Sequence, residues 1–353
     1  MRQTILERVF SVTPLDVVVM EQARLRQQQL TKPAGSLGKL EDIAIQMAGI
    51  TGQLLPEIKQ KAVIIMAADH GVAIEGVSAY PSDVTAQMVH NFLRGGAAIN
   101  ALARSAGARV IVVDIGVAGD LSHPDLISRK VAPGTADFML EPAMIEAQML
   151  QAIQVGMDVF DEQLRQGVAL VATGDMGIGN TTASSAITSV LLHTPEALVT
   201  GRGTGINDEQ LEHKIQVIEK AIEKNAPDAN DPLDVLMKVG GLEIAGLVGV
   251  IVAAASRRVP VVIDGFISGA AALIAVELNP MVSNYLFAGH VSVERGHRLI
   301  LEKIGISPLL DLQLRLGEGT GAVLAMSIIE SALRAHREMA TFAEAGVSTR
   351  EEE

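Results

Sequence analysis

Short apolar runs alternate with longer helical stretches along most of the chain. The runs are rich in Val, Ile and Ala, and they are Ala62–Ala68, Arg109–Ile115, Val168–Thr173, Val259–Asp264, Asn284–Ala288 and the weaker Leu309–Leu312. Helices are expected between them, for example over residues 83–105, 142–166, 265–278 and 293–304. This alternation predicts an α/β fold with a doubly wound, mostly parallel sheet. In such a sheet, ligands bind at the carboxyl ends of the strands.

The two ends of the chain show helical periodicity without strands. Near the N-terminus, apolar residues recur at helical spacing at Leu37, Leu40, Ile43, Ala44, Met47 and Ile50. A last helix is expected over about 319–340. We therefore predict a small helical subdomain from residues 1–58 and 319–345, a large α/β nucleotide-binding domain over 59–318, and a polar tail over 346–353.

Composition narrows the class of protein. The chain is 48% hydrophobic but only 3% aromatic, as expected when Ala, Val, Ile and Leu fill the core around a parallel sheet. The net charge is −13 and no basic cluster exceeds Arg257-Arg258, which argues against nucleic acid as a partner. The chain has no cysteine, so disulfides and thiolate metal sites are excluded.

No segment has the pattern of a membrane or export signal. Residues Met1–Thr4 lack the basic-then-apolar order of a signal peptide. The most apolar stretch, Gly240–Ser256, is short for a membrane span and contains Glu243. We therefore expect a soluble, cytoplasmic protein without membrane contact.

The glycine-rich segment Thr173–Thr182 is the strongest local signal for ligand binding. It reads Thr-Gly-Asp-Met-Gly-Ile-Gly-Asn-Thr-Thr and joins a predicted strand to a predicted helix. Glycines and capping hydroxyls at such a turn direct backbone N–H groups and the helix dipole toward one point, which suits a phosphate. The segment is neither a Walker motif nor a spaced G-x-G-x-x-G. A tight turn with an ordinary helix cap is the alternative.

Other loops are placed to line the same cleft. A second glycine-rich loop, Gly201–Gly205, precedes a predicted helix with Lys214, and lysine is a mobile charge suited to phosphate, although a single lysine is more often a surface residue. The segments Ala68–Gly71, Asp264–Phe266 and Gly289–Ser292 end three strands. The eight histidines form no pattern such as H-E-x-x-H, so structural histidines are expected rather than a metal site.

Glu318 stands among three glycines in the segment Arg315-Leu316-Gly317-Glu318-Gly319-Thr320-Gly321. Glycine lets a ligand approach the backbone, so a lone glutamate here can act as a general base. The alternative is a solvated acid before a helix, where the dipole favours it. Enzymes that use phosphoribosyl pyrophosphate usually carry two adjacent acids after an apolar run, but Val110–Ile115 contains only Asp114.

Taken together, these segments resemble the nicotinate-nucleotide–dimethylbenzimidazole phosphoribosyltransferase family, which builds the lower-ligand nucleotide of cobamides. The resemblance covers nearly the whole chain and rests on Leu30–Gly38, Ala68–Val72, Ser78–Pro81, Val84–Met88, Gly177–Thr182, Gly201–Gly205, Asp264–Gly269 and Gly317–Gly321. The chain departs from the family at Asp175, where Glu is usual, at Pro33-Ala34, where Pro-Pro is frequent, and at Asn207, where Asp is usual. The shorter Asp175 side chain leaves open whether it serves as a second carboxylate.

The resemblance implies a phosphoribosyl transfer from nicotinate mononucleotide to a benzimidazole-type base. The pyridinium leaves as a neutral ring, so no acid is needed, whereas the acceptor N–H becomes acidic during attack, so one base is enough. Glu318 is expected to be that base, and Asp175 to assist at the developing oxocarbenium. Attack from the opposite face inverts C1′ and gives an α-glycoside. No metal and no cofactor are required.

The resemblance also assigns binding residues. The 5′-phosphate is expected to lie against a set of loop residues together with a lysine and a serine: Gly174, Met176, Gly177, Ile178, Gly179, Asn180, Thr181, Lys214 and Ser292. Arg315 and Gly317 are expected near the nicotinate and Asp264 near the ribose. Gly203 and Gln87 are also expected to bind substrate, because they lie in the matching segments Gly201–Gly205 and Val84–Met88.

The acceptor pocket is expected to be apolar and tolerant. Tyr80, Met88 and Met176 are its candidate walls, because flat aromatic bases favour apolar and sulfur surfaces. The sequence leaves open whether the acceptor is dimethylbenzimidazole, another benzimidazole, a purine or a phenol. The same base would also serve a phenol.

Two alternatives concern partners and activity. A homodimer is expected because the family is typically dimeric and because the helix face with Leu37, Leu40 and Met47 needs a cover, and a heterodimer with a paralogue is also possible. The chain could instead be a non-catalytic or regulatory nucleotide-binding paralogue that works with an active partner. Asp175 keeps that alternative open, and the retained Glu318 argues against it.

Overall fold

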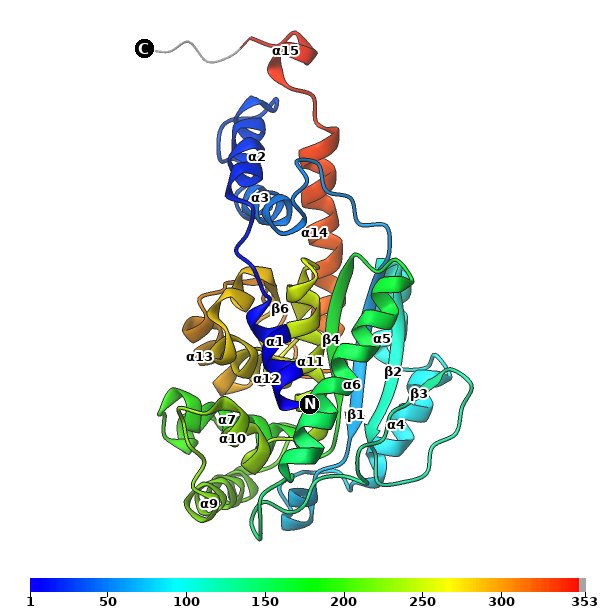
Figure 1. Cartoon of the computed structure of the whole chain (residues 1–353), viewed down its shortest axis with the longest axis vertical. Helices are drawn as coiled ribbons and strands as arrows, with labels where there is room; N and C mark the ends of the chain where they lie inside the picture. The colour runs from blue at the N-terminus through cyan, green and yellow to red at the C-terminus, as the bar shows by residue number, and fades with distance from the viewer. Residues whose placement is uncertain (349–353) are drawn as a thin grey trace.

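The computed structural model describes residues 1–348, and residues 349–353 of the predicted polar tail lie outside the described part. Helices cover both faces of a central sheet, and further helices extend from one end of it (Figure 1). Among the described residues, no helix is both long and apolar enough to cross a membrane.

The central sheet has seven strands, all parallel, in the order β3-β2-β1-β4-β5-β6-β7. The strands are β1 (Lys61–Ala68), β2 (Ala108–Gly116), β3 (Leu126–Ser128), β4 (Leu170–Met176), β5 (Val261–Ile263), β6 (Leu286–His290) and β7 (Pro308–Leu310). β1 and β4 are buried over almost their whole length, which explains their near-continuous apolar sequence. The predicted doubly wound parallel sheet is confirmed.

Strand positions differ from the prediction at the sheet edges. β5 keeps only three residues of the predicted run Val259–Asp264, and β6 begins after a 3-10 helix at Pro280–Tyr285 rather than at Asn284. β3 was not predicted, because three residues on an edge carry no readable periodicity. The long apolar runs in the centre of the sheet predicted their strands more reliably than the short runs at its edges.

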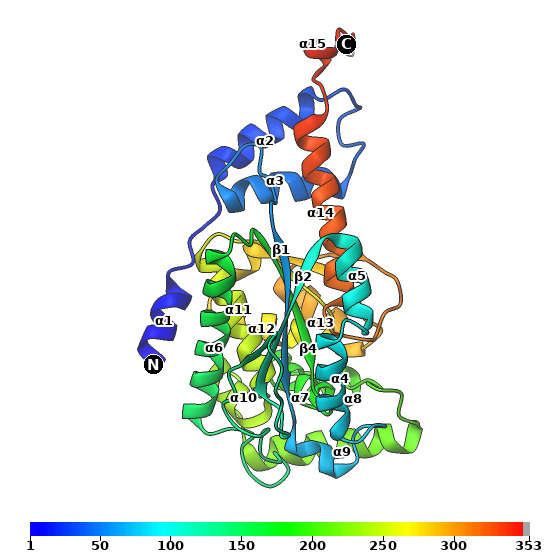
Figure 2. The same cartoon turned by 90° about the vertical axis from the view of Figure 1, so that its right-hand side faces the viewer.

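Helices on both faces complete the layers. In Figure 2, α6, α11 and α12 lie on one side of the sheet, and α4, α5 and α14 lie on the other. The helices are α1 (Arg2–Phe10), α2 (Val17–Gln29), α3 (Lys39–Thr51), α4 (Asp83–Leu93), α5 (Ala98–Ala106), α6 (Glu146–Arg165), α7 (Asn180–Leu192), α8 (Glu196–Val199), α9 (Asp208–Asn225), α10 (Pro232–Val239), α11 (Leu242–Ser256), α12 (Phe266–Leu278), α13 (Arg295–Ile304), α14 (Thr320–Glu338) and α15 (Phe342–Ala345). The helix predicted over 83–105 is two helices, because Gly95 adopts a positive φ between α4 and α5.

The helices α2 and α3 pack together beside the C-terminal half of α14, beyond the amino ends of the strands (Figures 1 and 2). Met47 of α3 is 1% exposed, so it is already covered within one chain, while Leu37 and Leu40 are partly exposed. The expectation that Met47 needs a neighbour to cover it is therefore wrong. The dimer itself stays a prediction.

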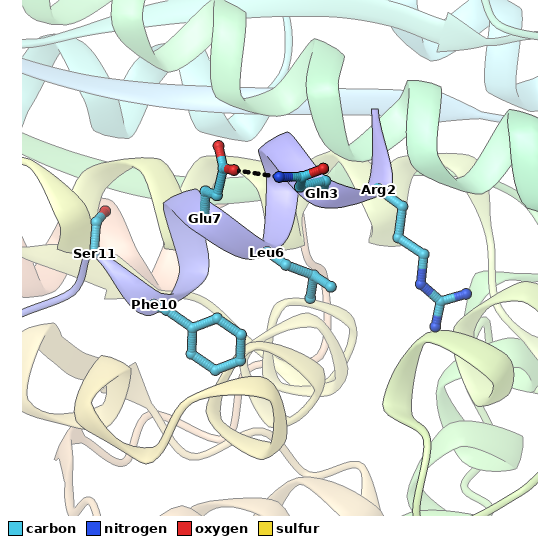
Figure 3. Close-up of a pocket in the computed structure, with 6 residues that line it drawn as sticks. All are labelled: Arg2, Gln3, Leu6, Glu7, Phe10 and Ser11. Atoms are coloured by element: carbon cyan, nitrogen blue, oxygen red, sulfur yellow. Dashed lines mark hydrogen bonds between the residues drawn. The ribbon is translucent and has the colours of Figure 1, made fainter.

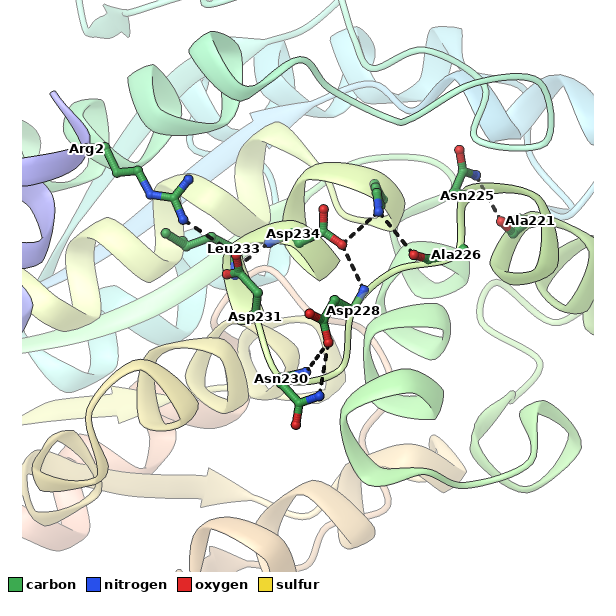
Figure 4. A network of polar contacts seen from close by, with 10 residues as sticks. Arg2, Ala221, Asn225, Ala226, Asp228, Asn230, Asp231, Leu233 and Asp234 are labelled. Carbon is green, nitrogen blue, oxygen red and sulfur yellow. Dashed lines mark hydrogen bonds and ion pairs between the residues drawn. The ribbon is translucent and has the colours of Figure 1, made fainter.

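α1 does not join α2 and α3 but lies against α6 and α11. Ile5 and Val9 are buried there, whereas Arg2 and Phe10 are exposed, and Figure 3 shows Arg2, Leu6 and Phe10 among the side chains that line a pocket along this helix. Arg2 ties α1 to its neighbours through Glu146 at 2.8 Å and Asp231 at 3.5 Å, the second contact being drawn in Figure 4. The division into a helical and an α/β unit remains our proposal, with α1 attached to the latter.

Candidate active site

A cavity of about 530 Å³ opens at the carboxyl ends of the central strands. Its walls come from glycine-containing loops that follow β4, β5 and β6, together with the loops near residues 78–80, 203–204 and 315–318. The structure brings most of the predicted site residues to this one cavity: Tyr80, Met88, Asp175, Met176, Gly177, Ile178, Gly179, Asn180, Thr181, Gly203, Ser292, Arg315, Gly317 and Glu318.

Four predicted residues do not line the cavity. Gln87 is exposed on α4. Gly174 lies within β4, where an added Cβ would approach the carbonyl oxygen of Glu318 to 2.7 Å, so this glycine lets the two backbones meet. Lys214 and Asp264 are both fully buried behind the cavity wall. Their contacts define roles that the sequence does not show.

The loop after β4 bends sharply beneath the cavity. Gly179 has a φ of +99° just before α7, a conformation that glycine adopts without strain. A Cβ on Gly177 would overlap the carbonyl oxygen of Ala68. The Asn180 side-chain amide donates to the Asp175 carboxylate at 2.9 Å, which links the two ends of the turn. α7 therefore begins at the cavity, where its dipole favours an anion, although the N–H groups of Ile178 and Asn180 are already bonded to Thr85 and Gly177.

A buried cation lies behind one part of the cavity wall. Lys214 of α9 is fully buried, and its ammonium donates to Oγ1 of Thr181 at 2.8 Å. Burial lowers the pKa of Lys214 to about 8, and the nearby Glu294 carboxylate opposes this shift. A Cβ on Gly203 would lie 3.4 Å from the Lys214 ammonium nitrogen. The lysine, the threonine and the second glycine loop thus meet at one point.

Glu294 is a cavity residue that the sequence did not reveal. Its carboxylate accepts the backbone N–H of Gly203 at 2.9 Å, so it fixes the second glycine loop. A Cβ on Gly201 would overlap this carboxylate, which explains a glycine there. Glu294 stands 91 residues from its partner in the chain, and no local pattern marks such a contact.

Glu318 sits in a strained backbone segment that also lines the cavity. Gly317, Glu318 and Gly319 have φ values of +82°, +64° and +88°, although only glycine adopts such angles easily. Asp264 stabilises this segment by accepting the N–H groups of Gly319 at 3.1 Å and Gly321 at 2.7 Å. Both carboxylate oxygens of Asp264 therefore bind the first turn of α14. The side chain is fully buried and does not line the cavity, so its position does not support the expected contact with a ribose.

The Glu318 side chain lies at the N-terminus of α5. Its Oε2 accepts the backbone N–H of Ile99 at 3.4 Å. Burial and the nearby charge of Asp264 raise the pKa of Glu318, while the N–H of Ile99 partly opposes this change. A carboxylate with a raised pKa is a stronger base, and this one lines the cavity.

Asp175 differs from Glu318 in its surroundings. Burial, with the charges of Asp264, Glu243 and Glu318, raises the pKa of Asp175 well above its usual range, against a smaller opposing effect of Asn180. These neighbours favour the protonated form of Asp175 more than that of an ordinary aspartate. The two cavity acids are therefore suited to different tasks, with Glu318 the better proton acceptor.

Two histidines border the Asp264 side of the cavity. His290 ends β6, and its Nε2 lies 3.6 Å from the Asp264 carboxylate. Burial alone would lower the pKa of His290, but the Asp264 carboxylate outweighs burial and raises it. His297 of α13 accepts the backbone N–H of Ser292 at 2.9 Å through Nδ1. Burial and the neighbouring His290 lower the pKa of His297 to about 3, so it is neutral and positions Ser292.

Three loops meet at the rim of the cavity. Oγ1 of Thr204 accepts the backbone N–H of Ala79 at 3.0 Å, and the Arg315 guanidinium donates to the carbonyl of Gly203 at 3.4 Å. Tyr80 stands beside them with 55% of its surface exposed. Over residues 1–348, no group of three or more His, Cys, Asp or Glu side chains is arranged to hold a metal ion.

Comparison with known proteins agrees with this arrangement. The protein-family profile described as Phosphoribosyltransferase matches residues 12–347. The chain is 62% identical over 342 residues to a nicotinate-nucleotide–dimethylbenzimidazole phosphoribosyltransferase of Chloroflexus aggregans, and the match covers 97% of each chain. A protein of the same name from Roseiflexus sp. is 59% identical over 343 residues, also with 97% coverage of both. The crystal structure of CobT from Thermus thermophilus superposes with a TM-score of 0.91 at 49% identity, covering 94% of this chain and 99% of that one.

Proposed function

The chain belongs to the nicotinate-nucleotide–dimethylbenzimidazole phosphoribosyltransferase family of pentosyltransferases, and we propose that it moves the 5-phosphoribosyl group of nicotinate mononucleotide to a benzimidazole-type base in cobamide synthesis. The observation that carries this proposal is the placement of Glu318 in the cavity wall and of Lys214 just behind that wall, where its ammonium donates to the cavity residue Thr181. One supplies a proton acceptor, and the other supplies a buried positive charge for a phosphate.

The donor phosphate binds where the glycine loop meets Lys214. The N–H groups at the start of α7, the Thr181 hydroxyl and the Lys214 ammonium converge there, with Ser292 on the adjoining wall. A phosphate dianion suits this group, because it would satisfy the buried ammonium that now has only a hydroxyl and a more distant carboxylate beside it. The ribose then extends from that corner toward Glu318.

The transfer itself breaks the C1′–N bond of the nucleotide and forms a new C1′–N bond to the acceptor. The electron pair of the broken bond stays on the nicotinate ring nitrogen, which leaves neutral. The acceptor nitrogen attacks the opposite face, so C1′ inverts to the α-glycoside. Glu318 takes the proton from the second acceptor nitrogen, which loses it more readily as positive charge develops in the ring.

The raised pKa values of Glu318 and Asp175 agree with Glu318 as the base and Asp175 as an assisting acid. Glu318 ionises more readily than Asp175, because fewer acids surround it and Ile99 donates to it. The negative charge of Glu318 also stabilises the positive charge that develops at C1′. Asp175 keeps Asn180 in place and, when protonated, can donate to a ribose or base oxygen. The shorter Asp175 side chain is therefore compatible with transfer.

The acceptor lies against the Tyr80, Met88 and Met176 side of the cavity. These walls offer apolar and sulfur surface and few fixed donors, so ring substituents affect binding only weakly. A phenol places an O–H where the benzimidazole places its N–H, so the same base would give an O-glycoside. We propose benzimidazoles as the principal acceptors and phenols as further ones.

The direct test is product analysis with the purified chain. Nicotinate mononucleotide and 5,6-dimethylbenzimidazole should give nicotinate and a phosphoribosyl-benzimidazole, identified by mass spectrometry, with the α-configuration at C1′ by NMR. The non-catalytic paralogue is the second hypothesis, and it predicts nucleotide binding without transfer by the chain alone. Transfer without any added partner would exclude it. A β-configured product would contradict single-step inversion.

A further inference from the structure

A buried hydrogen-bonded pair lies behind the nucleotide loop and does not line the cavity. Nε2 of His70, just after β1, lies 2.7 Å from Oε1 of Glu243 in the first turn of α11. Both side chains are fully buried, with 0% exposure. A charged or polar pair in such a position is costly to desolvate, so its presence calls for a role.

Three glycines of two loops pack against this pair. A Cβ on Gly177 would lie 3.4 Å from Nε2 of His70, and one on Gly179 would lie 3.1 Å from Cβ of His70. On the other side, a Cβ on Gly241 would overlap the ring and come within 2.7 Å of Glu243. The imidazole therefore fills the space between the loop that follows β4 and the loop that precedes α11.

The pair fixes the ring rather than leaving it free to turn. A short hydrogen bond to a carboxylate is among the stronger interactions available to an imidazole, and it sets the ring orientation. The flanking glycines permit the ring to pack against Gly177 and Gly179, which line the cavity at the phosphate position proposed above. Movement of the ring would therefore move the phosphate-binding backbone.

We propose that His70 and Glu243 are positioning residues that hold the loop Gly177–Gly179 in the conformation that binds the 5′-phosphate of the donor nucleotide. This inference rests on the proposed function, which it deepens. Neither residue contacts substrate. Their effect should appear in nucleotide binding, whereas the chemical step depends on Glu318 at another part of the cavity.

Kinetics with two donors separates positioning from a merely structural role. Glu243→Leu removes the acceptor, and Glu243→Gln keeps an oxygen in nearly the same place. We expect Glu243→Leu to raise the KM for nicotinate mononucleotide about tenfold or more, with kcat changed by no more than about threefold, and Glu243→Gln to restore most of the affinity. For nicotinate riboside, which lacks the phosphate, kcat/KM should stay near the native value in both variants.

A matched control comes from a second buried histidine far from the cavity. His336 is fully buried in α14 and bonds Gln27 at 2.9 Å and the carbonyl of Leu54 at 3.0 Å. His336→Gln should lower the melting temperature without changing the KM for either donor. If Glu243→Leu does not fold, His70→Asn provides the milder disruption, with the same expected rise in nucleotide KM.

Several outcomes would overturn the inference. An unchanged nucleotide KM in the variants would do so, as would an equal loss of kcat/KM for riboside and nucleotide, or the same KM rise in His336→Gln. Calorimetric binding of nicotinate mononucleotide to native protein and variants gives the same comparison without turnover. An inactive native protein would contradict the proposed function. The affinities of native protein and variants for nicotinate mononucleotide would still decide whether His70 and Glu243 position the loop.

Discussion

The carboxylate of Asp264 accepts the backbone N–H of Gly321 at 2.7 Å, and this bond fixes the start of the helix that follows Glu318. The same carboxylate accepts the N–H groups of Gly319 at 3.1 Å and Ala322 at 3.0 Å. An acid from the loop after β5 therefore acts as the cap of α14, where carboxylates are favoured. The strained conformation of Glu318 depends on this neighbour.

The cap predicts a specific effect of Asp264→Asn. The amide offers one acceptor oxygen in place of two, so at least one of the three N–H groups loses its partner, at a cost of about 1–3 kcal/mol in unfolding free energy. Because Glu318 would also lose its fixed position, we expect kcat to fall by about tenfold or more while the nucleotide KM changes little. Thermal unfolding and steady-state kinetics measure both effects.

A second helix cap provides the control for Asp264. Asp231 accepts the N–H groups of Leu233 at 3.0 Å and Asp234 at 3.3 Å at the start of α10 (Figure 4). Asp231→Ala removes this cap and should lower stability by about 1 kcal/mol without lowering kcat. Equal loss of kcat in both variants would show that general destabilisation, rather than the position of Glu318, explains the effect.

Lys214 predicts a pH dependence of donor binding. Its pKa is lowered to about 8, so the free protein loses this positive charge as the pH rises through that value. Because only the protonated form attracts phosphate, the nucleotide KM should rise above pH 8 by up to about tenfold per pH unit. The KM for nicotinate riboside should stay flat over the same range.

Two lysine variants test the assignment of that pH dependence. Lys214→Gln should show a high nucleotide KM at every pH and no rise near pH 8. Lys224→Gln, on an exposed position of the same helix, should retain the native profile. A rise in KM near pH 8 that persists in Lys214→Gln would assign the titration to another group.

Replacement of Gly179 by alanine should affect nucleotide binding, whereas replacement of Gly76, which also has a positive φ, should not. Gly179 has a φ of +99° and little room beside His70, whereas Gly76 has a φ of +73° and nothing within 4 Å of an added Cβ. Both Ala variants should lose stability, since positive φ is unfavourable for alanine, by about 1 kcal/mol. Only Gly179→Ala should also weaken nucleotide binding by calorimetry. Native affinity in that variant would argue against a role of this loop in phosphate binding.

The acceptor wall predicts broad specificity. A competition among 5,6-dimethylbenzimidazole, benzimidazole and p-cresol at equal concentration should give products from all three, because apolar walls distinguish one methyl group by only about 1–3 kcal/mol. Tyr80 stands half exposed at the rim, so Tyr80→Ala should shift the ratio toward the dimethyl compound. If the other two compounds neither react nor inhibit, the wall is more selective than we propose.

The sheet and two loops of the cavity could be predicted from the sequence. The long buried strands β1 and β4 gave apolar runs that predict the sheet, and glycines after β4 and around Glu318 marked two loops of the cavity. Both signals are local. Parallel topology then brings the loops to one edge, because the carboxyl ends of parallel strands meet there.

The contacts that position the loops could not be predicted in the same way. His70 and Glu243 are 173 residues apart, and Asp264 is 57 residues from Gly321. An acid after a strand reads the same whether it faces a ligand or caps a distant helix, so nothing in the sequence opposed the place near the ribose that the family resemblance implied for Asp264. Burial and partners, which only the fold supplies, separate the two roles.

The central claim is that Glu318 removes a proton from the acceptor, and one comparison tests it most directly. Glu318→Gln and native protein are each assayed with benzimidazole and with 1-methylbenzimidazole, which attacks through its free nitrogen but has no N–H to lose. We predict that the variant is slower by about 10² or more with benzimidazole, the scale of general-base catalysis, but loses much less with the methylated acceptor, where only the charge of Glu318 near C1′ is missing. An equal loss with both acceptors would contradict a role of Glu318 as the base and leave only electrostatic stabilisation of C1′.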